Sequence, residues 1–142
     1  MLAIDYGRRR LGLAISDEMQ LTARPLQTLT RTNRRNDMRR LREIARENAV
    51  ALIVVGHPLH LDGSAGEMAE ETARFAARIR KELGLPVELA DERLSSWEAE
   101  QMDAAGVHGK RRGGSVDEVA AAIILRGYLE RERSHGKERR HR

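Results

Sequence analysis

The chain has 142 residues, of which 34% are charged and none is cysteine, and its formal net charge is +4. This length suits one domain rather than two, and the lack of cysteine excludes a disulfide scaffold, a thiolate metal site and a cysteine nucleophile. No apolar run approaches the ~20 residues of a membrane span, and the first residues mix acids and bases unlike a secretory signal. We therefore expect a cytoplasmic protein with no membrane partner.

The basic excess lies at the C-terminal end. Residues 131–142 contain six Lys or Arg and two Glu, which accounts for the whole net charge of +4. Elsewhere basic residues form clusters, namely Arg8-Arg9-Arg10, Arg34-Arg35, Arg39-Arg40 and Lys110-Arg111-Arg112. Such clusters suit a phosphate backbone, although an arginine-rich solvated surface explains each of them equally well.

The first fifteen residues predict two short strands joined by a tight turn. Apolar residues alternate on either side of a segment that contains Gly7 and Gly12. Asp5 interrupts the first strand, and a buried carboxylate there requires water, a cationic partner or a metal ion. An ordinary turn-forming aspartate is the alternative.

The middle of the chain predicts a third strand, a helix and a buried strand. Residues 21–29 contain Pro25, which favours an edge strand in an antiparallel meander. After a polar linker at 33–36, apolar residues at helical spacing predict a helix over 37–48. The aliphatic run 51–56 is typical of a parallel strand buried on both faces. His57 and His60 follow it, and isolated loop histidines are more often structural than catalytic.

A second helix and strand lead to another acidic cluster. Ser64 and Glu67 have capping-box spacing, which predicts a helix to about residue 83 with Met68 and Phe75 on its buried face. The strand 86–90 then runs into Asp91-Glu92-Arg93. These charges resemble the situation at Asp5, although a structural ion-pair cluster also explains them.

The last third predicts two more helices around a basic loop. One helix begins at Ser95 and includes Trp97 as a core residue, and the glycine-rich segment 106–114 predicts a mobile loop. The final helix begins at Ser115 and carries Asp117 in its first turn, where the helix dipole alone favours an acid. From residue 131 onwards the apolar periodicity ends, so we expect a domain over 1–130 and a disordered basic tail over 131–142.

Three acids therefore stand at positions that could meet at one edge of the sheet. Asp5 ends the first strand, Glu92 follows the last strand, and Asp117 opens the last helix. Carboxylate oxygens without cysteine or a paired-histidine motif favour Mg²⁺ or Mn²⁺ over zinc. Such a site can hold two ions about 4 Å apart for in-line phosphodiester cleavage.

Four motifs in this order resemble the YqgF (RuvX) family of bacterial RNase H-like proteins, which are associated with pre-16S ribosomal RNA processing and with Holliday junction resolution. The motifs are Ile4-Asp5-Tyr6-Gly7 with Gly12, Val55-Gly56-His57-Pro58 with Asp62-Gly63, Asp91-Glu92-Arg93-Leu94-Ser95-Ser96, and Val116-Asp117-Glu118-Val119-Ala120-Ala121 with Ile124-Leu125. The resemblance spans residues 2–130. The arginines at 8–10 and Ser95-Ser96 depart mildly from the family pattern, and neither departure removes a proposed metal ligand.

The resemblance implies an α/β fold with a mixed RNase H-like sheet of three antiparallel and two parallel strands. It implies that Asp5 bridges two ions, that Glu92 and Asp117 complete their coordination, and that Asp91 or Arg93 orients or neutralises the site. The nucleic acid would be held by Arg8, Arg9, Arg10, Arg93, Lys110, Arg111 and Arg112. Because aromatic residues make up only 3% of the chain, recognition of shape and charge is expected rather than base stacking.

The substrate and the assembly state stay open at this point. A pre-16S rRNA processing nuclease acting on structured RNA is the first prediction, and a Holliday junction resolvase acting on branched DNA is the second. A resolvase should be a two-fold homodimer, whereas an RNA nuclease could be a monomer. A non-catalytic RNA-binding factor in ribosome maturation is a further alternative. The Asp5 turn also resembles the phosphate loop of actin-like ATPases, but those need two such domains to enclose a nucleotide.

Overall fold

The computed structural model describes residues 1–92 and 116–140, with side chains over 1–92 and 117–133. Its elements in chain order are β1 (Leu2–Asp5), β2 (Arg10–Ser16), β3 (Ala23–Thr30), α1 (Arg34–Glu47), β4 (Ile53–His57), α2 (Glu67–Leu83), β5 (Val87–Asp91) and α4 (Val116–Arg140). Within this part of the chain, no helix combines the length and the apolar character that a membrane crossing needs.

The strands form one mixed sheet in the order β3-β2-β1-β4-β5. β1, β2 and β3 pair antiparallel, whereas β4 and β5 run parallel to β1. This arrangement confirms the predicted fold class, an α/β fold with three antiparallel and two parallel strands. It also confirms β3 as an edge strand, and its pairing with β2 becomes irregular between Leu13 and Ala14, beside Pro25, which has no N–H to donate.

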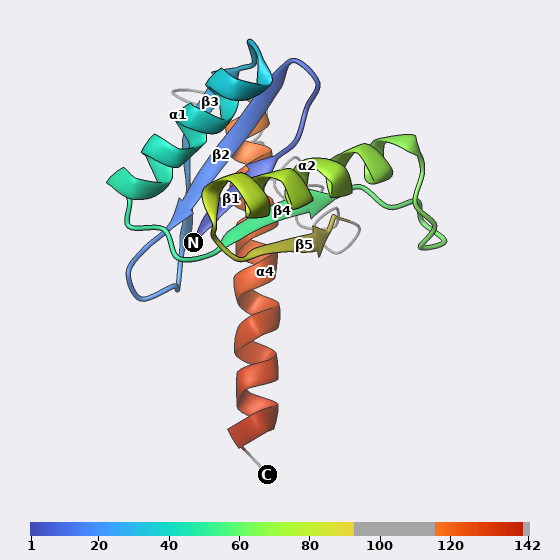
Figure 1. The fold of residues 1–142 in the computed structure, drawn as a ribbon. Helices are drawn as coiled ribbons and strands as arrows, with labels where there is room; N and C mark the ends of the chain where they lie inside the picture. The colour runs from blue at the N-terminus through green and yellow to red at the C-terminus, as the bar shows by residue number, and fades with distance from the viewer. Residues whose placement is uncertain (93–115, 141–142) are drawn as a thin grey trace.

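Helices cover both faces of the sheet. Figure 1 shows α1 and α2 on one side and α4 on the other, with the C-terminal part of α4 continuing beyond the sheet. The α1/α2 side buries large aliphatic residues such as Leu2, Ile4 and Leu13. The α4 side buries small ones such as Ala3, Ala14 and Ala90. Small residues let the axis of a helix approach the sheet closely.

Two helix starts differ from the sequence-based expectation. α1 begins at Arg34 rather than Asp37, because the side chain of Asn33 accepts a hydrogen bond from the Asn36 N–H (2.8 Å) and caps the helix. The predicted Ser64–Glu67 capping box is wrong. The Ser64 hydroxyl donates to Asp62 Oδ1 (2.6 Å) instead, and Gly66 occupies the N-cap of α2.

The buried face of α2 differs from the prediction at one residue. Phe75 is buried as expected, with 2% of its surface exposed, but Met68 is 37% exposed and Ala69 is buried in its place. Ala69 precedes buried Thr72 by three residues and buried Ala76 by seven, so it shares their face of the helix, whereas Met68 lies at the edge of that face.

The C-terminal segment differs as well. α4 continues to Arg140, so residues 131–140 are helical where a disordered tail was expected. This segment is rich in Glu, Arg and Lys, which have high intrinsic helix propensity. The division of the chain into a domain over 1–130 and a tail stays a prediction.

Candidate nuclease site

Asp5 lies at the carboxyl end of β1 between two glycines of neighbouring strands. Its partner across the antiparallel pair is Gly12 of β2. On the other side, the pairing of Ile4 with Val55 places Gly56 of β4 beyond the last parallel pair. The carboxylate therefore has a residue without a side chain on each side of it. The space that two side chains would fill there is taken instead by the backbone of Asp117 and by the side chains of Glu92 and Ile124.

The strand pleat places the candidate acids and both glycines on the α4 side. Side chains two residues apart in a strand point to the same face. The cluster that α4 covers includes one buried residue from each of four strands, namely Ala3, Ala14, Val54 and Ala90. Each of them lies two positions from a site residue or glycine: Ala3 from Asp5, Ala14 from Gly12, Val54 from Gly56, and Ala90 from Glu92. The first turn of α4 lies on this same face, because the backbone carbonyl of Asp117 contacts Gly12.

Glu92 reaches over Gly56 toward Asp5. A Cβ atom added at Gly56 would lie 2.6 Å from Glu92 Oε1 and 2.6 Å from Ile124 Cδ1. The backbone N–H of Glu92 donates to the carbonyl of His57 (3.1 Å), which fixes the chain where it leaves β5. The side chains of Asp5 and Glu92 share a hydrogen bond. Two predicted acids that are 87 positions apart in the sequence thus touch in the fold.

The electrostatics of this pair favour a proton or a cation. Burial, the charges of Glu92 and Asp117, and the hydrogen bond with Glu92 together raise the pKa of Asp5 to about 7, and burial is the largest of these causes. Burial also raises the pKa of Glu92, as does the charge of Asp91, whereas the hydrogen bond from Asp5 lowers it. When the pair carries one proton, these opposite effects of the hydrogen bond favour the proton on Asp5, whose carboxyl then donates the hydrogen bond to Glu92.

Asp117 is close enough to influence Asp5 electrostatically, yet its carboxylate also contacts a cation. Arg10 Nε lies 3.1 Å from Asp117 Oδ2, and the two side chains are 64% and 29% exposed, respectively. A pair this exposed contributes about 0–1 kcal/mol, so it can open readily. Within residues 1–92 and 116–140, no three His, Asp or Glu side chains are arranged to hold one metal ion together.

The donor set nevertheless fits a hard divalent cation in its chemistry. The three carboxylates lie at one end of the sheet, and oxygen ligands of this kind suit Mg²⁺ or Mn²⁺. Burial is the largest cause of the raised pKa of Asp5, and the charges of Glu92 and Asp117 add to it, so a bound cation would relieve the repulsion among the three carboxylates. Asp5 and Glu92 already face each other, and Asp117 forms an ion pair with Arg10.

The remaining predicted site residues divide between those described and those that are not. Asp91 ends β5 opposite His57 and acts on Glu92 through its charge. Arg93, Lys110, Arg111 and Arg112 lie outside the described residues, as do the predicted helix that contains Trp97 and the loop 106–114. His57 is half-buried at the end of β4, and the exposed His60 packs against Gly66.

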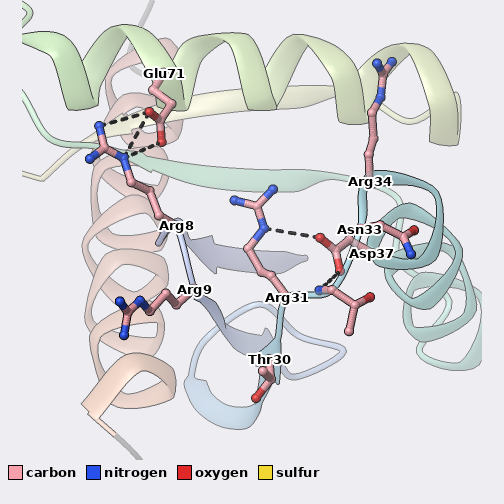
Figure 2. A pocket seen from close by; sticks show the side chains of 9 residues that line it. Arg8, Arg9, Thr30, Arg31, Asn33, Arg34, Asp37 and Glu71 are labelled. Atoms are coloured by element: carbon pink, nitrogen blue, oxygen red, sulfur yellow. Dashed lines mark hydrogen bonds and ion pairs between the residues drawn. The ribbon is translucent and has the colours of Figure 1, made fainter.

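The three consecutive arginines do not form one cluster. Arg8 turns to the α2 side, where its Nε donates to Glu71 (3.2 Å), and Arg10 turns to the α4 side and Asp117. Arg9 is exposed between them. Figure 2 shows Arg8 beside Glu71, with Arg9 pointing away from that pair. The β1–β2 turn therefore carries positive charge to both faces of the sheet.

A polar cluster on the α1/α2 side was missed by the sequence analysis. The Tyr6 hydroxyl donates to Glu71 Oε2 (2.7 Å), and the Arg31 guanidinium lies 5.1 Å from the centre of the Tyr6 ring. Arg31 Nε lies 3.3 Å from Oδ2 of Asp37, which is only 3% exposed. The one available signal was Asp37 on the apolar stripe of α1, because a buried acid requires a partner.

The sheet order and the carboxylates at the end of β1 define an α/β protein of the RNase H-like fold. The structure superposes on that of T. thermophilus RuvC in complex with Holliday junction substrate, with a TM-score of 0.57 and 17% identity over 93% of this chain and 96% of that one. The chain belongs to the RuvX family, because the family model, described as "Holliday junction resolvase", matches residues 1–131.

Curated relatives match over nearly their full length. One from Anaeromyxobacter dehalogenans (strain 2CP-C) is 47% identical over 131 residues, which cover 92% of this chain and 96% of the relative. One from Geobacillus kaustophilus (strain HTA426) is 47% identical over 135 residues, which cover 93% and 98%. Both carry the name "Putative pre-16S rRNA nuclease". These matches confirm the family resemblance that the four motifs predicted.

Proposed function

We propose that this protein is a divalent-metal-dependent endonuclease of the cytoplasm that cleaves structured nucleic acid, foremost at the 5′ end of pre-16S rRNA. The observation that carries the proposal is the pair of partly buried carboxyls, Asp5 and Glu92, with Asp117 close by at the end of β1. The names of the curated relatives support the same reaction and substrate.

Each acid has a separate role in the proposed site. Both Glu92 and Asp117 act on Asp5 through their charges, so Asp5 would contact both of two ions, whereas Glu92 and Asp117 would each complete the ligands of one ion. Bound Mg²⁺ or Mn²⁺ activates a water molecule and stabilises the leaving oxygen of the phosphodiester. The charge of Asp91 raises the pKa of Glu92, and Arg93 would neutralise or orient the Glu92 carboxylate.

Arg10 would exchange partners when substrate binds. In the structure its guanidinium contacts Asp117, and the side chain is 64% exposed. A phosphate of the substrate is a competing anion for the same guanidinium. When the Arg10 guanidinium leaves Asp117 for a substrate phosphate, the Asp117 carboxylate would become available as a metal ligand. Arg10 would then hold the nucleic-acid backbone together with Arg8, Arg9 and the predicted basic segment 110–112.

Cleavage assays on charge-neutral variants test the proposal. We expect Asp5→Asn, Glu92→Gln and Asp117→Asn each to lose at least about a hundredfold in the rate with Mn²⁺ or Mg²⁺. Glu47→Gln, which changes an exposed acid at the end of α1, should cleave at the wild-type rate. Unchanged cleavage in all three site variants would discard the mechanism. Binding of RNA without cleavage of any substrate would favour the non-catalytic RNA-binding factor.

A Holliday junction resolvase is the second candidate, favoured by the superposition on RuvC bound to a junction and by the description of the family model. Parallel assays should compare a four-way DNA junction with a pre-16S rRNA 5′ leader. A resolvase must cut two strands symmetrically, so a solution mass measurement should then give a homodimer. Cleavage of the leader by a monomer would support the RNA nuclease instead.

A further inference from the structure

A cavity of about 480 Å³ opens on the α1/α2 side of the same sheet end. It lies where the β1–β2 turn meets the end of β3 and the start of α1, and Arg8, Arg9, Arg31, Arg34, Asp37 and Glu71 line it together with Thr30, Thr32 and Asn33. Figure 2 shows Arg31 near its centre, between the Arg8–Glu71 pair and Asp37. None of these residues belongs to the carboxylate site.

The guanidinium of Arg31 is held in place within this cavity. Its side chain is 19% exposed, its Nε lies 3.3 Å from Asp37 Oδ2, and its Nη1 donates to the carbonyl of Gly7 (3.1 Å). The rings of Tyr6 and Phe75 lie against it at 5.1 and 5.4 Å. An arginine has five N–H donors, so a fixed guanidinium with donors to spare can bind an anion at little entropic cost.

The charge balance of the cavity is positive. Both acids already face donors, because Asp37 faces Arg31 and the N–H of Thr32 (3.0 Å), and Glu71 faces Arg8 and the Tyr6 hydroxyl. The remaining two cations are exposed Arg9 and Arg34. Within the described part of the chain Arg9 has no ion pair, and Arg34 Nε is 3.7 Å from Glu82 Oε2, too far for a hydrogen bond.

The start of α1 adds neutral donors to this positive charge. Asn33 accepts from the N–H of Asn36, and the carbonyl of Asn33 accepts from the N–H of Asp37. No acceptor in residues 1–92 and 116–140 bonds the N–H of Arg34 or Arg35. Free N–H groups at a helix start are favourable contacts for phosphate oxygens.

We propose that this cavity binds a backbone phosphate of the nucleic-acid substrate, at a distance from the bond that is cut. The inference rests on the proposed function and extends it. Asp5 and Tyr6 are adjacent and point to opposite faces of the sheet, so a strand of nucleic acid that crosses the β1–β2 turn reaches both the carboxylates and the cavity. The contacts use charge and N–H donors, so they select a phosphate rather than a base.

Binding measurements in EDTA isolate this contact from cleavage. Fluorescence anisotropy with a labelled pre-16S rRNA 5′ leader and with a four-way DNA junction should be recorded over a range of salt concentrations. We expect the Arg9→Ala/Arg34→Ala double variant to bind at least about tenfold more weakly to the substrate that the protein prefers, with a log–log salt slope reduced by about 1 because one phosphate contact is lost. Arg39→Ala, an exposed arginine on α1 outside the cavity, serves as the control.

Neutral linkages locate the phosphate. Strands that each carry one uncharged methylphosphonate should reveal at least one position where the substitution weakens binding to the wild-type protein. The same substitution should have no further effect on the double variant. Inorganic phosphate is tested as a separate competitor, because a site built for the free anion would be blocked at millimolar phosphate and would show no dependence on the linkage.

The outcomes separate this inference from the nuclease assignment. A double variant with the affinity and salt slope of Arg39→Ala overturns the phosphate site, even if the wild-type protein cleaves RNA. Competition by phosphate without a linkage effect also overturns it. A linkage effect that disappears in the double variant supports the site, even if no cleavage is found and the nuclease assignment itself has failed.

Discussion

The two faces of the sheet are built from different kinds of residues. The α1/α2 face buries large aliphatic side chains, among them Leu2, Ile4, Leu11 and Leu13, each with 0% of its surface exposed. The α4 face buries Ala3, Ala14 and Ala90, and it presents Gly12 and Gly56 next to Asp5. Large side chains supply most of the buried apolar area, whereas small ones leave space for carboxylates and for the close approach of a helix.

This difference separates stability from chemistry along the same strands. Alternate residues of β1 serve the two purposes, because Ile4 points into the large core while Asp5 points to the α4 side. Damage to the large core should therefore lower the free energy of unfolding without altering the site in the molecules that remain folded. Damage to the α4 face should alter the site directly. The predictions below test this separation, from the largest expected effect to the smallest.

The largest loss of stability is expected from Leu13→Ala. Leu13 is fully buried between the sheet and the two helices, and truncation of such a residue costs about 2–5 kcal/mol. Urea unfolding measures this change, and cleavage per folded molecule should stay at the wild-type level. Leu61→Ala, at a residue that is 93% exposed, should unfold like the wild type. A Leu13→Ala protein that is as stable as Leu61→Ala would contradict the assignment of the large core.

Gly12→Ala should disturb both stability and cleavage. The added Cβ would clash with the backbone carbonyl of Asp117, which cannot rotate away as a side chain can. We expect a loss of about 1–3 kcal/mol in the free energy of unfolding and a loss of cleavage, because the first turn of α4 must move. Gly56→Ala should cost less stability, since its Cβ meets the movable ends of the Glu92 and Ile124 side chains, although it too should reduce cleavage by displacing Glu92. Equal losses of stability at both glycines would argue against backbone contact as the cause at Gly12.

Asp5→Asn should change how stability depends on pH. The pKa of Asp5 is raised from 3.8 to about 7 in the folded protein, so its contribution to stability is present below pH 4 and is lost as the pH rises through 7. The Asn variant lacks this loss. We expect it to match the wild type near pH 4 and to exceed it by about 2 kcal/mol at pH 8, after allowance for partial exposure to water.

Urea unfolding in EDTA at pH 4.5, 6 and 8 tests this expectation. A difference between the two proteins that is constant with pH would contradict the raised pKa of Asp5. Addition of Mg²⁺ or Mn²⁺ at pH 8 should then raise the Tm of the wild type and leave that of Asp5→Asn nearly unchanged, because a ligand stabilises only the folded state that binds it.

Tyr128→Phe is expected to have the smallest effect. The Tyr128 hydroxyl donates to Glu88 Oε2 and so attaches α4 to β5. Burial and the carboxylate beside it both raise the pKa of this tyrosine. Loss of the hydrogen bond should cost about 0.5–1.5 kcal/mol, as measured by urea unfolding. Because exposed Glu88 regains water in the variant, a loss well above this range would indicate that the ring packing changed as well.

The sequence patterns correctly predict the strands of the sheet, and they also predict which strand is buried and parallel and which lies at an edge. Alternation predicts the first two strands, the aliphatic run 51–56 predicts the buried parallel strand, and Pro25 predicts an edge. Local signals work there because backbone hydrogen bonding and burial act over a few residues. They fail at the start of α2, where Ser64 bonds to Asp62 rather than to the helix. A capping motif only states which bonds are possible, and a nearby acid competes for the same hydroxyl.

The sequence by itself determined the order of the elements that the structure describes, the family motifs and the acids that the proposed site requires. Only the tertiary structure decided that Asp5 and Glu92 share a hydrogen bond and that Arg10 forms an ion pair with Asp117. It also decided that Arg8 and Arg10 turn to opposite faces of the sheet. The physical reason is that these contacts join residues from different strands and helices. Their distances depend on sheet register and on how closely α4 approaches Gly12, and no local pattern encodes either quantity.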